Sequence, residues 1–98
     1  MYKALYFDEV FSDIQQAKEM YKKQHGGLEE RFAQCIEEAI LKVLKMPTAF
    51  NIRYKNVRIA HPKTFPYNIH FFINDNDKTV VFIGIVLNKR KDALKIKR

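Results

Sequence analysis

The chain has 98 residues, 47% of them hydrophobic, with only 3 Gly and 3 Pro. That composition suits one hydrophobic core and excludes long disordered segments, so we expect a single domain over residues 1–98. Eighteen Lys and Arg against 11 Asp and Glu give a net charge of +7, which favours nucleic acid, ribosomes or an acidic protein as partners. Many small proteins are basic for no specific reason, but here basic residues are dense in the final segment, at Lys89, Arg90, Lys91, Lys95, Lys97 and Arg98.

Several other classes are excluded by what the sequence lacks. No apolar run approaches the roughly 18–20 residues of a membrane span, and the N-terminus has none of the regions of a signal peptide. We therefore expect a soluble, cytoplasmic protein without a membrane partner. The one cysteine, Cys35, lies in a helical pattern and is expected to be a buried thiol rather than part of a disulfide. The histidines, His25, His61 and His70, are scattered, so no metal and no cofactor is expected.

The N-terminal half predicts one strand and two helices. Residues 2–7 alternate as a short strand, and a helix over about 9–24 carries Val10, Ile14, Ala17 and Tyr21 on one stripe. Asp8 is the expected N-cap, while Ser12 followed by Gln15 offers a competing capping box and a later start. A second helix is expected over about 28–45, after Gly26 and Gly27 and before Pro47. Two such stripes form a helical hairpin that must pack on a sheet.

The C-terminal half predicts the remaining strands. Residues 50–54 are extended, and 57–61 form a strand. Residues 65–87 form a long β-hairpin whose connector, 74–78, contains two Asn and two Asp. Because its second arm is apolar on both faces, we expect it in the middle of the sheet. The predicted order is β-α-α-β-β-β, an α+β fold with an antiparallel helical hairpin on a mostly antiparallel, curved sheet.

Arg58 is the main candidate for function, because an arginine within an apolar strand must reach solvent or be paired. If Arg58 shares an open face with Asn68, His70 and Phe72, and with Lys89 and Arg90 at the end of the last strand, that face suits a phosphate backbone or RNA. An ion pair with a glutamate of the second helix is the competing interpretation.

His70 is the second candidate, since it flanks a short turn with His61 and could act as an acid or base near neutral pH. A half-buried structural histidine is the alternative. The sequence contains no phosphate-cradling glycine loop, nucleophile elbow or HExxH motif.

Several pieces together resemble the RelE/ParE superfamily of bacterial toxins. They are the element order, the Gly-Gly-Leu-Glu-Glu-Arg-Phe stretch between the helices, the Met46-Pro47 helix stop, Val57-Arg58 opening a strand, the Phe65–Phe71 segment and the final strand running into residues 88–92. The resemblance covers nearly the whole chain. It implies a plasmid-stabilisation or chromosomal toxin, neutralised by a cognate antitoxin that adds a helix and a strand.

The superfamily implies two targets. RelE-like toxins cleave messenger RNA on the ribosome without a metal, using Arg and Lys with a C-terminal Tyr or His. ParE-like toxins block DNA gyrase and lack that set. The long helical hairpin, Asn88 in place of a common His, and the lack of Tyr, His or Glu after Arg90 favour the ParE-like branch.

The resemblance matches Arg58 and Arg90 to family positions for phosphate contact. We therefore expect target or nucleic-acid binding at Arg58, Lys89, Arg90 and Lys91. The nuclease alternative would use Arg58, His70 and Arg90 as catalytic candidates. A third possibility is an inactive binding module. A free chain could also cover its antitoxin surface by forming a homodimer.

Overall fold

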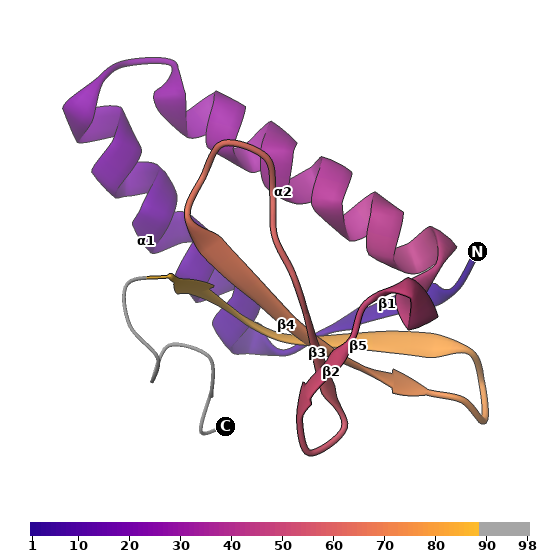
Figure 1. The fold of residues 1–98 in the computed structure, drawn as a ribbon. Coiled ribbons are helices and arrows are strands. Elements are labelled where there is room, and N and C mark those ends of the chain that lie inside the picture. Colours follow the sequence, from indigo (N-terminus) through magenta and orange to yellow (C-terminus); the bar gives the residue numbers. More distant parts are fainter. Residues whose placement is uncertain (89–98) are drawn as a thin grey trace.

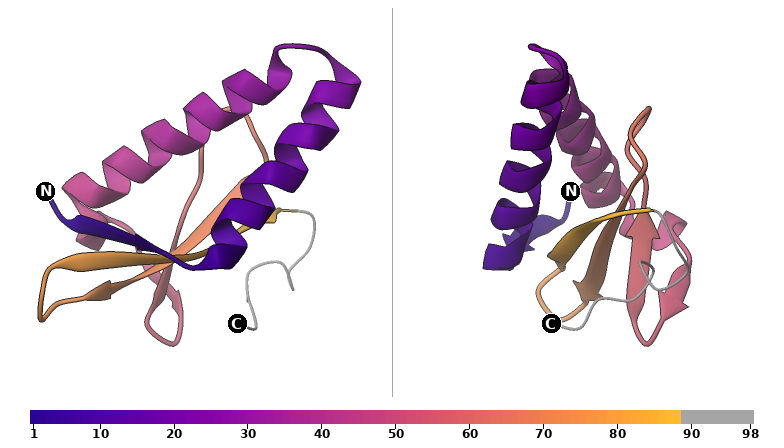
Figure 2. Two further views of the ribbon diagram at one scale, coloured as in Figure 1. Left: turned by 180° about the vertical axis from the view of Figure 1, so that it is seen from behind. Right: turned by 90° about the vertical axis from the view of Figure 1, so that its left-hand side faces the viewer.

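The structure is a computed structural model that describes residues 1–88, and it has two layers (Figure 1). A hairpin of two helices covers one face of a five-stranded sheet (Figure 2). The elements in chain order are β1 (Lys3–Tyr6), α1 (Asp8–Gln24), α2 (Leu28–Lys45), the 3₁₀ turn η1 (Pro47–Ala49), β2 (Ile52–Tyr54), β3 (Val57–Ala60), β4 (Tyr67–Asn74) and β5 (Thr79–Leu87).

The strand order in the sheet is β1-β5-β4-β3-β2. Strand β1 runs parallel to β5, and every other neighbouring pair is antiparallel. The predicted α+β fold and the long hairpin are confirmed. Strand β5 is an interior strand as expected, although β4 occupies the middle position. The extended segment before β3 forms a fifth, short edge strand, β2, which pairs with β3 across a tight turn.

Helix α1 starts directly at the end of β1. The Phe7 N–H still donates to the Phe82 carbonyl of β5, at 2.9 Å, and Phe7 takes the N-cap position without any side-chain cap. The prediction of Asp8 as N-cap was therefore wrong, because Asp8 is already the first helical residue. The alternative box at Ser12 and Gln15 lies inside the helix. Asp8 and Glu9 still favour the start, since negative charge in the first turn complements the helix dipole.

The link between the helices depends on Gly27, whose φ of 95° lies in the left-handed region. A side chain there would be strained, whereas glycine adopts this conformation freely. Helix α2 then begins at Leu28 and ends at Lys45, as predicted. Cys35 packs against the core but is only partly buried, so the predicted buried thiol is confirmed in part.

The core between helices and sheet is organised by an aromatic cluster. Phe32 of α2 is fully buried and lies 5.3 Å from Tyr21, 5.3 Å from Phe65 and 5.1 Å from Tyr67, measured between ring centroids. These four rings join both helices to the loop before β4 and to β4 itself. Phe32 therefore helps to fix the helical hairpin on the sheet, together with the other buried residues of both helices.

The sheet carries apolar residues on both faces. A β-bulge shifts the β4–β5 register, because His70 pairs with Gly84 while its neighbour Phe71 pairs with Phe82. The extra residue, Ile83, lies in a second apolar cluster with Val57 and Val81, against which Phe7, Tyr54 and Phe72 pack. We call this the outer cluster, because it lies on the face of the sheet opposite the helices. None of the helices in the described part of the chain is long and apolar enough to cross a membrane.

We expect Phe32→Ala to lower the free energy of unfolding by about 3–5 kcal/mol, because it removes the centre of a close-packed core. Urea denaturation followed by circular dichroism measures the change. Phe11→Ala is the matched control, since Phe11 is 58% exposed and contacts one ring, that of Tyr6, so its removal should cost clearly less than that of Phe32. Equal losses in the two variants would contradict this view of the core.

Candidate functional site

Asn68, His70 and Phe72 of β4 lie on the outer face of the sheet, but this row of side chains is not open to solvent. Asn68 and His70 are both fully buried, and only Phe72 is partly exposed. The expectation of a solvent-open row was therefore wrong at two of its three positions. Apolar neighbours on the same face explain part of the difference, since the buried Ile59 of β3 stands opposite His70.

His70 is hydrogen-bonded to a residue that the sequence did not indicate. Its Nδ1 lies 2.9 Å from the hydroxyl of Tyr54, on the edge strand β2, and the two ring centroids are 5.8 Å apart. The sequence did not indicate Tyr54, because residues 50–54 were expected only to be extended. That expectation predicted neither strand β2 nor the register in which it pairs. The side-chain amide of Asn68, in contrast, forms no hydrogen bond with any residue among 1–88.

Arg58 lies on the other face of the sheet. In the antiparallel pairing of β3 with β4 it stands opposite Phe71, a core residue on the helix side. Its guanidinium donates a hydrogen bond to the carbonyl of Phe50, just before β2. The expected face shared with His70 was wrong, and within the described chain no second-helix glutamate forms the competing ion pair.

The other candidate residues are not brought together with Arg58 or His70. His61 follows β3, is exposed, and its Nδ1 lies 3.2 Å from the carbonyl of Tyr67. Lys89, Arg90 and Lys91 lie outside the described residues, and their expected role stays a prediction. The described chain ends at Asn88, whose N–H donates to the carbonyl of Pro66 at 2.7 Å. No cluster of three or more metal-ligating side chains occurs within residues 1–88.

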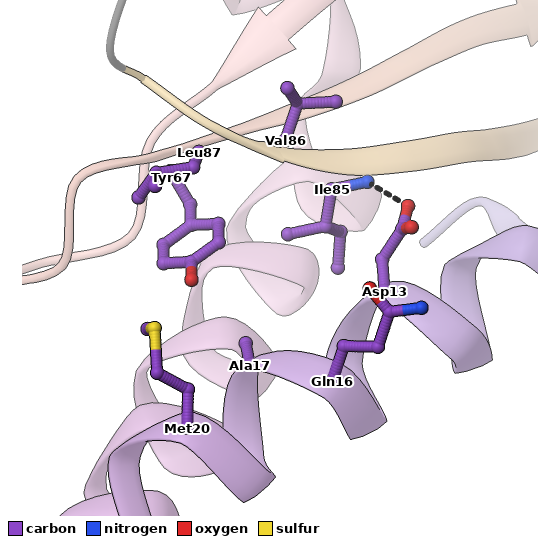
Figure 3. A pocket seen from close by; sticks show the side chains of 8 residues that line it. All are labelled: Asp13, Gln16, Ala17, Met20, Tyr67, Ile85, Val86 and Leu87. Atoms are coloured by element: carbon purple, nitrogen blue, oxygen red, sulfur yellow. Dashed lines mark hydrogen bonds between the residues drawn. The ribbon is translucent and has the colours of Figure 1, made fainter. Parts of the chain in front are cut away.

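A groove of about 400 Å³ runs between α1 and the last part of β5 (Figure 3). Strand β1 pairs with β5 only as far as Phe82. Beyond Phe82 the same edge of β5 is not paired with β1, and α1 faces it. One carboxylate oxygen of Asp13 accepts the N–H of Ile85 at 2.9 Å. Asp13 thus substitutes for the missing strand partner, and this role was not visible in the sequence because it joins residues 72 positions apart.

We expect Asp13→Ala to lower the free energy of unfolding by about 1–3 kcal/mol, because the Ile85 amide loses its acceptor at a partly buried edge. Hydrogen exchange at Ile85, measured by NMR, should accelerate in this variant. Asp13→Asn keeps a carbonyl acceptor and should lose less. Glu19→Ala, at an exposed position of the same helix outside its first turn, is the control, and an effect of equal size there would refute the capping role of Asp13.

Tyr67 forms the wall of this groove opposite Asp13 (Figure 3). Burial, together with the neighbouring phenol of Tyr21 and its hydrogen bond, raises the pKa of Tyr67 to about 12. The folded state therefore favours the neutral phenol. Its contribution to stability is complete below the ordinary tyrosine pKa of 10.0 and is lost as the pH rises towards 12.

We expect a phenolate absorbance titration of the folded protein to show one tyrosine ionising near pH 12, and Tyr67→Phe to remove that step. The same variant should flatten the fall of unfolding free energy between pH 10 and 12, because it removes the linked proton. Tyr54→Phe serves as the control. If the late ionisation step survives in Tyr67→Phe, it belongs to another tyrosine.

The two-layer arrangement defines the fold class: the chain has the fold of the ParE and RelE toxins. No family model matches the sequence, and no curated protein matches it either. A chain of the chromosomal ParDE toxin–antitoxin system from P. aeruginosa superposes with a TM-score of 0.75, at 15% identity, over 87% of this chain and 94% of that one.

Two E. coli structures are also similar. For the intact RelBE toxin–antitoxin complex the TM-score is 0.61 at 14% identity, over 92% of this chain and 100% of that one. For a RelE mutant in complex with an antitoxin RelBc peptide the TM-score is 0.68 at 13% identity, over 99% of this chain and 96% of that one. At this level of identity the similarities establish the fold, and the resemblance seen in the sequence is confirmed at that level.

Proposed function

We propose that this chain is the toxin of a type II toxin–antitoxin system, neutralised by a cognate antitoxin. The observation that carries the proposal is the similarity of the fold over 87% of the chain to a chain of a ParDE system, with a TM-score of 0.75. Two of the similar structures are complexes with an antitoxin, which supports the same kind of partner here.

For the target, we favour DNA gyrase, bound in the manner of a ParE-like toxin. The positions of Arg58 and His70 support this choice. A metal-independent nuclease needs its basic groups and its acid or base to converge on one phosphate. Here Arg58 faces the helix side and is engaged by Phe50, whereas His70 is fully buried on the outer face. These two residues cannot contact the same phosphate in this arrangement.

The second candidate is a RelE-like, ribosome-dependent messenger RNA endoribonuclease. The hydrogen bond between Tyr54 and His70 is the observation that favours it, because such a bond orients an imidazole for proton transfer. Lys89 and Arg90 would then supply the charge that stabilises the transition state.

Inducing this chain alone in a bacterial culture tests both targets. In the gyrase case cells form filaments, translation continues, and the purified protein inhibits supercoiling by gyrase. Prompt translational arrest with cleaved messages would instead support the nuclease. Normal growth at full expression, in a host without the antitoxin, would contradict the assignment as an active toxin.

The His70→Gln variant separates the two targets further. We expect it to keep its toxicity in the gyrase case, whereas a nuclease that lost its acid or base would slow on the order of 100-fold. Tyr54→Phe breaks the same hydrogen bond while leaving the imidazole, so it controls for lost stability. Message cleavage and gyrase supercoiling, both measured with purified proteins, give the readouts.

A further inference from the structure

Strand β1 is an edge strand, and one of its two sides has no partner strand among residues 1–88. The N–H of Phe7 donates to the carbonyl of Phe82 in β5, at 2.9 Å, and that of Lys3 donates to the residue before β5, at 3.0 Å. Backbone groups of successive residues in a strand point in opposite directions. The N–H and carbonyl groups of Ala4 and Tyr6 therefore point away from β5. We call this side of β1 the free edge.

Exposed apolar side chains gather along the free edge. Five of the seven large hydrophobic residues that are exposed in the described chain belong to β1 or to segments next to it. The ring of Phe11 lies 5.6 Å from that of Tyr6, and Leu41 and Tyr6 line one groove of about 290 Å³. The N–H of Tyr2 donates to the carbonyl of Leu44 at 2.9 Å, which holds the end of α2 beside β1. Such a patch indicates an interaction surface. The five residues are Met1, Leu5, Phe11, Leu41 and Met46.

The charges around β1 suit a second copy of the same strand. Lys3 stands at the start of β1, whereas Asp8 and Glu9 follow its end, and all three are exposed. An antiparallel copy therefore brings the basic start of one strand next to the acidic end of the other. The net positive charge of the whole chain does not oppose this contact, because residues 1–45 carry 7 Lys and Arg against 8 Asp and Glu.

The register of such a pair follows from the backbone. With Leu5 on a two-fold axis, Ala4 lies opposite Tyr6 of the second copy, and each pair of this kind exchanges both of its N–H···O bonds. Opposite residues then also point to the same face, since Ala4 and Tyr6 lie on the helix side. Leu5 lies on the outer face beside Val81 and meets its own copy there. A shift by two residues would instead set Tyr6 opposite Tyr2, whose N–H is already bonded to α2.

We propose that a second copy of this chain pairs with the free edge of β1, antiparallel and across a two-fold axis at Leu5, so that the two sheets become continuous. An edge strand is a template for such pairing, and two-fold dimers have self-complementary interfaces of this kind. The inference goes beyond the proposed function, because it requires neither a target nor an antitoxin. A strand of another protein is the competing occupant.

Sedimentation equilibrium of the full-length chain, at concentrations up to about 0.1 mM, tests the dimer. The key variant is Leu5→Lys, which places two like charges opposite each other on the axis. Ile52→Lys is the matched control, because Ile52 is 54% exposed against 57% for Leu5 and lies on β2, the other edge strand. We expect the natural chain and Ile52→Lys to dimerise, and Leu5→Lys to raise the dissociation constant by about tenfold or more. Both variants change exposed residues, and thermal unfolding checks that both stay folded.

A disulfide tests the register. The two Leu5 positions form a pair without hydrogen bonds, whose Cα atoms lie about 4.5 Å apart and within the range of a disulfide. Leu5→Cys, combined with Cys35→Ser, should therefore link two copies when a mild oxidant takes two electrons and two protons from the two thiols. Ala4→Cys in the same background is the control. Its two copies are diagonal neighbours about 7–8 Å apart, too far for a disulfide.

Three results would overturn the proposal. A natural chain that is monomeric at about 0.1 mM would leave the free edge to another protein. Equal weakening by Leu5→Lys and Ile52→Lys would show that the interface does not lie at β1. A disulfide in Ala4→Cys but not in Leu5→Cys would exclude the axis at Leu5. A failure of the proposed toxin function is a separate result, because it appears as normal growth whether the chain is a dimer or a monomer.

Discussion

The pairing of β4 with β5 is the constraint on which the rest of the structure depends. The two strands pair from Tyr67 opposite Leu87 to Asn74 opposite Thr79, and each then has a further neighbour in the sheet. The bulge at Ile83 lets Phe82 and Ile85 both face the helices although three positions separate them. Ile83 itself stays on the outer face with Val81, two residues before it, so β5 contributes apolar packing to both sides of the sheet.

The outer cluster explains why the sequence predicted the elements of the fold but not the faces of its strands. Both helices, the long hairpin and the α+β class followed from periodicity and turn residues, because a local pattern determines each of them. The faces of the strands did not follow. Val57 and Ile59 alternate with Arg58, and such a strand is normally placed with its apolar residues towards the helices. Here they face outwards, and Arg58 lies on the helix side opposite Phe71.

The candidate site was predictable only in part for the same reason. Arg58 and His70 stood out by residue type, but their separation onto opposite faces depends on strand register, which is a long-range property. Tyr54 and Asp13 gave no local signal, since each acts on a residue far away in sequence. The N-cap of α1 was misassigned because Phe7, whose N–H donates to the carbonyl of Phe82 in β5, takes that position without a capping side chain.

The parallel pairing of β1 with β5 has a consequence for how the chain is made. Lys3 lies opposite Thr79, so β1 cannot take its place in the sheet until β5 exists. At a synthesis rate of about 5–20 residues per second, β1 waits on the order of several seconds without its partner. The contacts that complete the fold are thus among the least local in the chain, which favours slow folding. A partly synthesised chain that has not reached Leu87 therefore lacks the finished sheet, and whatever activity depends on that sheet begins only after β5 has been made.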